Sequence, residues 1–263
     1  MYSDLGELLT QLIISGSSVD LAGWLISASA RVSGANLECW GELTGLRRTH
    51  IHLDTGLGTG VGSGVCSGVM VIDPDQGTLH ESSRGLALGP PKTVESARTI
   101  TLPPFLVELL GAYLATHDHP HVFVSPERQL YRRSNFSRRA LRPAADGAPR
   151  RRDPSQRLPA VKPGLTFHGL RHSHKTWMIA DNVPEIAQAR RLGHILDDKI
   201  RQTYSHVAAE VEHRLLAGLT DRWDKAVADS PHQPAWRDTP LAAPLLPDSL
   251  PGREKGAHRH GHP

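Results

Sequence analysis

Three short motifs in the last third of the chain contain residues that can handle a phosphate group. They read His168-Gly169-Leu170-Arg171-His172, Leu192-Gly193-His194 and Thr203-Tyr204-Ser205-His206-Val207. An arginine guanidinium binds two phosphate oxygens at once. An imidazole, with an unperturbed pKa near ~6.5, moves protons at neutral pH, and an activated tyrosine hydroxyl is a nucleophile. Together the motifs favour phosphoryl-transfer chemistry.

The first motif has the spacing of a helix with one cationic face. Its basic residues recur at offsets of three and four, so they share a face: His168, Arg171, His172 and Lys175. Leu170, Trp177 and Met178 occupy the opposite face, which is expected to pack on the core. The residues alone also allow a solvated helix on which His168 and His172, four residues apart, have the spacing of metal ligands. The H-E-x-x-H carboxylate that usually accompanies such a pair is missing from the sequence.

Tyr204 follows the apolar line of its own predicted helix. Ile200, Val207, Val211 and Leu215 stand at helical offsets from it, and a tyrosine in such a line is more often a core residue with its hydroxyl at the edge. A nucleophilic role requires help, since a phenol with a pKa near ~10 is mostly protonated at neutral pH. Clustered arginine and histidine side chains would stabilise the phenolate.

In this order and at this separation, the three motifs resemble the second signature block of the tyrosine recombinases, the phage integrase family. The resemblance runs from roughly Trp24 to Trp223. It implies that Tyr204 is a nucleophile that forms a 3′-phosphotyrosyl bond to DNA, and that Arg171 clamps the phosphate. It also implies that His168 and His194 transfer protons or bind the phosphate. That bond conserves the energy of the cut strand, so the family needs neither ATP nor metal, and no cofactor is expected.

The same resemblance assigns a lysine and exposes one departure. Lys92, in Gly89-Pro90-Pro91-Lys92-Thr93, matches the hairpin lysine that protonates the leaving 5′ oxygen. Trp40-Gly41-Glu42-Leu43 matches the end of the first signature block, which places Cys39 where the family carries the first of its two clamp arginines. Cysteine offers no fixed charge and no bidentate fork. A clamp arginine is worth ~10³–10⁵ in rate, so an inactive, DNA-binding remnant is the alternative to an active recombinase.

Other basic residues are expected to contact DNA. Arg47 imitates the opening of the first block, but the residues after it do not fit, so at most a backbone contact is expected there. The predicted DNA-binding residues are Arg47, Arg48, Arg98, His172 and Lys175. Ten arginines and only two aspartates lie between residues 128 and 157, in a chain of net charge +3. Such a stretch suits a polyanion, although a solvated loop explains any single arginine equally well.

Hydrophobic spacing predicts a mainly α fold with a small antiparallel β-sheet (α+β), as the resemblance to a recombinase catalytic domain also implies. Strands are expected at 69–72, 86–88 and 98–102, forming one sheet. A glycine-rich stretch at 56–68 is expected to be a flexible connector, and Pro103-Pro104 to open a helix. Further helices are expected at 5–14, 19–30, 36–53, 135–141, 168–180, 184–192 and 198–219.

The predicted organisation is a short helical leader at 1–30, a catalytic domain at 31–225 and a disordered Pro/His-rich tail at 226–263. The leader is too short for the core-binding domain of the family, so the chain is expected to be truncated at its N-terminus. Two cysteines, Cys39 and Cys66, and the lack of a signal peptide or a 20-residue apolar run predict a soluble cytoplasmic protein.

The resemblance implies double-stranded DNA as partner, a tetramer of this chain on paired sites and an accessory directionality protein. Two further alternatives are a type IB topoisomerase, which shares the Tyr/Arg/Lys/His chemistry, and a histidine–metal hydrolase. The T-Y-S-H-V and L-G-H motifs disfavour the topoisomerase. The missing carboxylates beside His168 and His172 disfavour the second.

Overall fold

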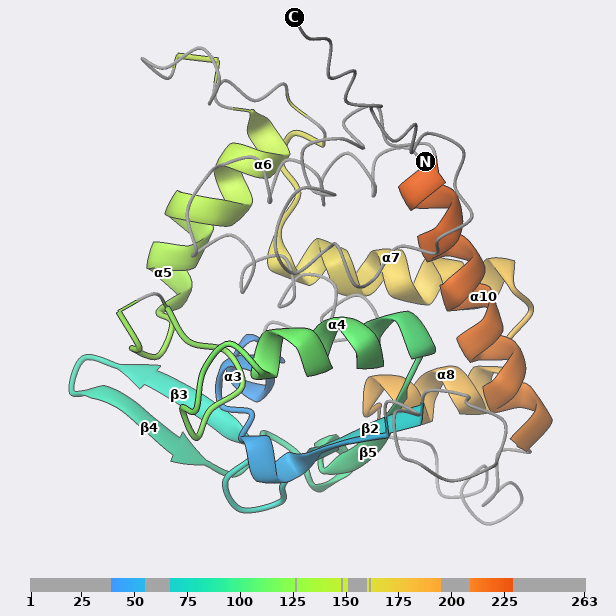
Figure 1. The fold of residues 1–263 in the computed structure, drawn as a ribbon, viewed down its shortest axis with the longest axis horizontal. Helices are drawn as coiled ribbons and strands as arrows, with labels where there is room; N and C mark the ends of the chain where they lie inside the picture. The colour runs from blue at the N-terminus through green and yellow to red at the C-terminus, as the bar shows by residue number, and fades with distance from the viewer. Residues whose placement is uncertain are drawn as a thin grey trace, which may run out of the picture.

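A computed structural model of the chain shows a mainly helical fold with antiparallel β-structure, as predicted, although the described strands form two small sheets instead of one (Figure 1). Several predicted segments lie outside the described residues: the helices at 5–14 and 19–30, nearly all of the glycine-rich connector, the Tyr204 motif, and all but the first three residues of the tail at 226–263. The structure describes residues 39–54, 67–125, 127–147, 149–150, 160, 162–194 and 209–228.

The larger sheet has three antiparallel strands in the order β1-β2-β5. These are β1 (Ile51–Asp54), β2 (Ser67–Ile72) and β5 (Arg98–Leu102). Met70 lies opposite Ile51 on one side and Ile100 on the other. Burial alternates along β2, so one face of the sheet lies in the core and the other faces outward. The strands predicted at 69–72 and 98–102 are therefore confirmed.

The predicted sheet was wrong in its third member. The strand predicted at 86–88 exists as β4 (Gly85–Gly89), but it pairs with β3 (Thr78–Ser82) in a separate hairpin. The place beside β2 is taken by β1, from a segment predicted to be helical. Only α3 (Cys39–Thr44) and a 3-10 turn at Arg48–His50 are helical there. The period-two burial of Ile51–Asp54 fits an edge strand better than a helix.

Two glycines bring α3 unusually close to the hairpin. A Cβ on Gly41 would lie 2.6 Å from the carbonyl oxygen of Leu79, and one on Gly45 would lie 2.7 Å from its amide nitrogen. Because any larger residue would push the helix off β3, these glycines determine where α3 sits. They thereby place Glu42, which is buried on the same helix.

The remaining helices agree with the spacing of the apolar residues. α4 (Pro104–Leu114) opens at the predicted proline pair, and α7 (Phe167–Ala180) and α8 (Glu185–Leu192) match their predictions within one residue. The helix predicted at 135–141 is longer, and that predicted at 198–219 is described only from 209 and runs to 228. Their bounds are α5 (Arg133–Phe136), a π-helical turn (Ser137–Leu141), α6 (Arg142–Asp146) and α10 (Ala209–Ala228).

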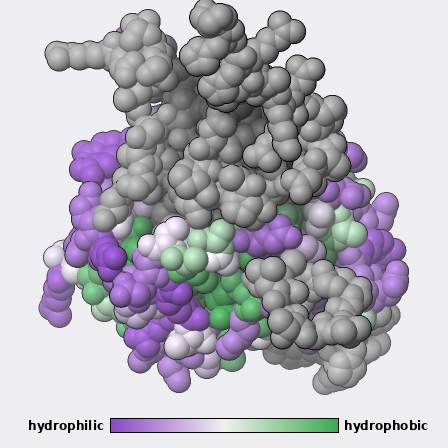
Figure 2. Space-filling view, viewed as in Figure 1, coloured by the Kyte–Doolittle hydropathy of each residue, from purple (hydrophilic) through white to green (hydrophobic). Residues whose placement is uncertain are grey.

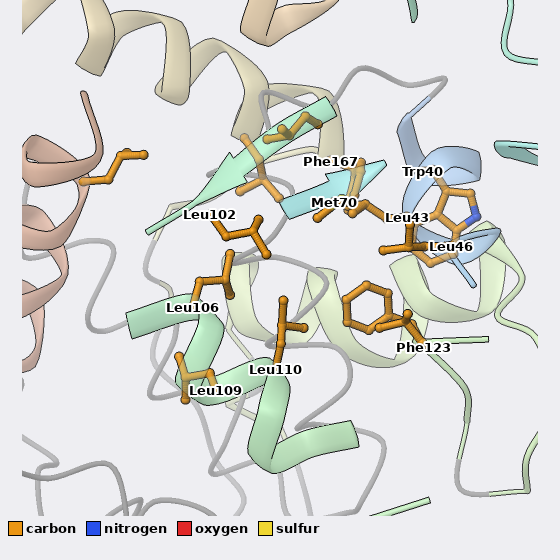
Figure 3. Close-up of a cluster of buried hydrophobic side chains, with 14 of the residues drawn as sticks. Trp40, Leu43, Leu46, Met70, Leu102, Leu106, Leu109, Leu110, Phe123 and Phe167 are labelled. Carbon is orange, nitrogen blue, oxygen red and sulfur yellow. The ribbon is translucent and has the colours of Figure 1, made fainter. Parts of the chain in front are cut away.

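The core lies between the sheet, α3, α4 and α7 (Figure 3). Trp40 of α3 packs against Phe136 and Phe167, with ring centroids 4.9 and 5.4 Å apart. Met70 and Leu110 are fully buried beside them. On the face drawn in Figure 2, apolar surface gathers around α4, with hydrophilic residues to its sides. No helix in the described part of the chain is long and apolar enough to cross a bilayer.

α10 packs against both α4 and α7. Trp223 stacks on Phe105 with centroids 4.8 Å apart and an interplanar angle of 5°. Arg222 is buried, forms an ion pair with Asp181 at the C-terminal end of α7 and lies 5.5 Å from the centre of the Trp177 ring. The last described helix is thus fixed to the body of the domain by an aromatic stack and by the ion pair of a buried arginine with the half-buried Asp181.

Candidate active site

α7 carries the first motif and begins where the sequence requires. The Thr166 hydroxyl accepts a hydrogen bond from the amide of Gly169 at 3.0 Å, which caps the helix. Leu170, Trp177 and Met178 face the core, as predicted. Arg171 does not belong to a solvent-facing side: only 4% of it is exposed. His172 is exposed and Lys175 half-buried, so the predicted cationic face runs from the interior to the surface.

Arg171 joins the first motif to the second. Its Nη1 donates to the carbonyl oxygen of Leu192 at 2.9 Å, and its Nη2 contacts Nε2 of His194. A guanidinium only donates, so Nε2 of His194 must accept. His194 is therefore held in its neutral form with the proton on Nδ1. The structure thus brings together Arg171 and His194, which the sequence placed 23 residues apart.

The Leu192-Gly193-His194 motif forms the C-terminal turn of α8. Gly193 adopts the left-handed conformation, with φ of 65°, which glycine reaches without steric cost. The amide of His194 then donates back to the carbonyl oxygen of Ala189 at 2.9 Å. The glycine of the motif is explained by this turn, which directs the His194 ring toward α7.

Positive charge dominates the electrostatics of this region. Burial lowers the pKa of His194, and the charges of Arg171, Lys175 and Arg98 lower it further. Burial also lowers the pKa of His168, followed by the nearby His172 and Arg171. The rings of His168 and His172 meet edge-to-face with centroids 4.5 Å apart. An anion that enters this region would relieve the repulsion among these groups.

A buried histidine on the same helix was not predicted. His174 is completely buried, and neither ring nitrogen has a hydrogen-bond partner among the described residues. Burial, with Arg191, Arg171 and Arg222 nearby, places its pKa well below the usual value. Its offset of four from Leu170 was the available signal, since that offset assigns it to the apolar face.

An arginine from the sheet and a glutamate from α3 meet beside the α8 turn. Nη2 of Arg98 donates to Oε2 of Glu42 at 3.2 Å, and the two side chains are 8% and 5% exposed. Arg98 also donates from Nε to the carbonyl oxygen of Arg191 at 3.1 Å and from Nη1 to that of Ser96 at 2.7 Å. Burial lowers the pKa of Arg191 to about 10. The sequence marked Arg98 only as a DNA contact.

The other predicted residues have different surroundings. Lys92 is exposed on the segment that joins β4 to β5. Arg48 is turned into the protein, where its guanidinium donates to the carbonyl oxygens of Leu114, His117 and His119. Arg47 forms an isolated backbone bridge with His121. Cys39 opens α3, one helical turn before Glu42, and Tyr204 lies outside the described residues. Within the described residues, no three His, Cys, Asp or Glu side chains cluster to hold a metal.

Comparison with solved structures identifies the fold. No protein-family model and no curated protein matches the sequence. The Tn1549 transposon integrase in complex with a circular intermediate DNA matches with a TM-score of 0.50 and 14% identity, over 81% of this chain and 62% of that one. The chain has an integrase fold. Its described helices and sheets thus agree with the fold expected from the resemblance to tyrosine recombinases.

Two further structures are similar over the same part of the chain. The Tn1549 integrase in complex with transposon right-end DNA has a TM-score of 0.49 and 14% identity, over 81% of this chain and 63% of that one. XerA recombinase has a TM-score of 0.44 and 19% identity, over 80% and 62%. This chain therefore spans less than two thirds of the length of the solved structures that it matches.

Proposed function

We propose that this protein is a tyrosine-type DNA strand transferase, a recombinase or integrase that cuts and rejoins DNA through a 3′-phosphotyrosine. One observation carries the proposal: Arg171 is buried, bonded to the Leu192 carbonyl and in contact with His194. A buried guanidinium beside neutral imidazoles is suited to a phosphate diester, which brings negative charge and several acceptor oxygens.

The chemical roles follow from the properties of each group. Arg171 would bind the non-bridging oxygens of the scissile phosphate. Once the phosphate displaces His194 from Arg171, Nε2 of His194 would take a proton and donate to these oxygens. His168 is a suitable proton-transfer group. Its Nδ1 is buried and has no hydrogen-bond partner within the described residues, and its lowered pKa favours the neutral imidazole, which can accept a proton. Tyr204 would attack phosphorus, and Lys92 would protonate the leaving 5′ oxygen.

The proposed strand transfer accounts for every bond and proton without a cofactor. The Tyr204 oxygen forms a bond to phosphorus as the bond to the 5′ oxygen breaks, and the phenolic proton passes to a neighbouring imidazole. Rejoining reverses both steps, so the energy of the diester is retained. His172 and Lys175 lie toward the surface on the same helix and would bind flanking phosphates, which predicts an affinity that falls steeply with salt. Assembly as a tetramer and control by an accessory protein are part of the proposal.

A nicked suicide substrate built from DNA that flanks the gene tests the proposal. A covalent protein–DNA band on a denaturing gel should appear with wild type and disappear in Tyr204→Phe. The Cys39→Arg variant belongs in the same experiment, because it restores a guanidinium one helical turn before Glu42. A band confined to Cys39→Arg would mean a complete site disabled at that position.

The second candidate is a DNA-binding protein that no longer cuts. It is favoured by Cys39, which supplies no fixed positive charge at the position of the first clamp arginine. For this candidate, no lane of the gel shows a covalent band, while a mobility-shift assay on the same DNA shows salt-dependent binding.

A further inference from the structure

The C-terminal turn of α8 is held from two sides by two arginines. Arg171 of α7 donates to the carbonyl oxygen of Leu192, and Arg98 of β5 donates to that of Arg191. The last carbonyls of a helix have no partner within the helix, and positive charge there is stabilising. These two bonds therefore fix the backbone from which His194 projects.

Arg98 is itself oriented by the rest of the protein. Glu42 holds Nη2, and the carbonyl oxygen of Ser96 holds Nη1. A Cβ on Gly193 would lie 3.0 Å from Nη1 of Arg98, so the guanidinium lies directly against the turn. Each of its three nitrogens has a partner, and the side chain is nearly buried. Lysine has one ammonium and no fork, and it cannot reproduce this arrangement.

We propose that Arg98, oriented by Glu42, is a positioning residue that fixes the Arg191–His194 turn so that the His194 ring meets Arg171. The inference rests on the proposed function, because it names what aligns that phosphate site. Arg98 acts through the backbone of the turn and does not itself touch the phosphate. Two simpler roles would leave the His194 ring where it is: a contribution to stability only, and a contribution of charge only.

The imidazole of His194 reports on this arrangement directly. While Nε2 accepts from Arg171, that nitrogen cannot take a proton, so the contact lowers the pKa of His194. The cations that face the ring are Arg171 and Lys175 from α7 and Arg98 from β5. If the turn is released, the ring leaves Arg171 and its pKa returns toward the ordinary value. If only the charge of Arg98 matters, a lysine in its place preserves the pKa.

The experiment is an NMR titration of His194 in the full chain, with the resonance assigned from a His194→Gln spectrum. The test variants are Arg98→Lys, which removes the fork, and Glu42→Gln. The glutamine replaces the charged partner of Arg98 with a neutral, weaker acceptor, so it loosens the orientation of Arg98 while it perturbs folding less. Arg222→Lys is the control, since it alters another buried arginine that is paired with a carboxylate. Asp181 of that pair lies ten residues along α7 from Arg171, or ~15 Å at the rise of a helix.

The positioning role predicts that the pKa of His194 rises by about 0.5 or more in both test variants and stays at the wild-type value in the control. A wild-type titration in folded Arg98→Lys, or in folded Glu42→Gln if the lysine variant does not fold, would overturn the inference. A similar rise in Arg222→Lys would also overturn it, because the shift would then reflect general loosening.

This titration and the DNA-trapping experiment fail independently. A wild-type protein that traps no DNA but shows the variant-dependent pKa would reject the strand-transfer activity and keep the positioning role. If the wild-type protein traps DNA while His194 in Arg98→Lys keeps the wild-type pKa, the strand-transfer activity is kept and the positioning role is rejected. In an active protein, Arg98→Lys should slow covalent trapping at least about 10-fold, as expected when a preorganised donor is misplaced.

Discussion

The buried pair between Glu42 and Arg98 makes a quantitative prediction about stability. Replacement of Glu42 by leucine leaves the guanidinium of Arg98 buried without its counter-charge, and loss of one partner of a buried pair costs ~3–5 kcal/mol. Arg98 keeps its bonds to the carbonyl oxygens of Ser96 and Arg191, so the lower end of this range is expected. For a domain of this size, ~3 kcal/mol corresponds to a Tm lowered by roughly 6–12 °C.

A double-mutant cycle measures the coupling between the two residues. Urea unfolding followed by circular dichroism would give the free energy of unfolding of wild type, Glu42→Leu, Arg98→Met and the double variant. Apolar residues of similar volume often replace a buried ion pair at little cost, so the double variant should regain at least half of the stability lost in Glu42→Leu. If each single variant cost less than ~0.5 kcal/mol, the pair would behave as a solvated surface pair and the reasoning would be refuted.

Three other perturbations have defined outcomes. Gly193→Ala should cost ~1–3 kcal/mol of unfolding free energy in a urea titration, because alanine is strained at positive φ and crowds Arg98; an unchanged midpoint would contradict the left-handed turn. His174 is neutral when folded, and its lowered pKa means that the unfolded chain takes up a proton first as the pH falls through ~6.5. This residue should therefore lower the free energy of unfolding, by on the order of 1 kcal/mol, as the pH falls from 7.5 to 5.5; His174→Gln should lose that share, and a wild-type pH slope in the variant would refute it. Arg138→Ala and Arg139→Ala remove exposed charges within the π-helical turn, and each should reduce the salt slope of DNA binding by about 1, measured by fluorescence anisotropy; an unchanged slope would exclude these two residues from the interface.

The parts of the fold that the sequence predicted depend on local spacing. The offsets of Leu170, Trp177 and Met178 define α7, and β-branched residues define β2 and β5, because neighbours in the chain determine these patterns. Which strand lies beside β2 depends on α3 stopping at Gly45, where the hairpin approaches. That approach is a tertiary contact with Leu79, which spacing alone does not show.

For the candidate site too, the sequence predicted the residues in local motifs but not the contacts between distant segments. Arg171, His168 and His194 are found from their motifs, and the structure brings Arg171 and His194 into contact. The roles of Arg98 and Glu42 were missed because each depends on the other, and 56 residues separate them. Arg48 looked like a surface cation, but a set of backbone carbonyls more than 60 residues away binds its guanidinium.

The spacing of these contacts along the chain has a consequence for how the protein folds. The bonds of Arg98 around the α8 turn join residues separated by 56 and 93 positions. Contacts of such long range form slowly, since the chain must close large loops before it gains from them. Helices α4 and α7 can form from neighbouring residues, whereas the arginine cluster requires α3, β5 and α8 to have met. We therefore expect refolding chains to regain helical circular dichroism before they regain any affinity for a phosphate oxyanion such as vanadate.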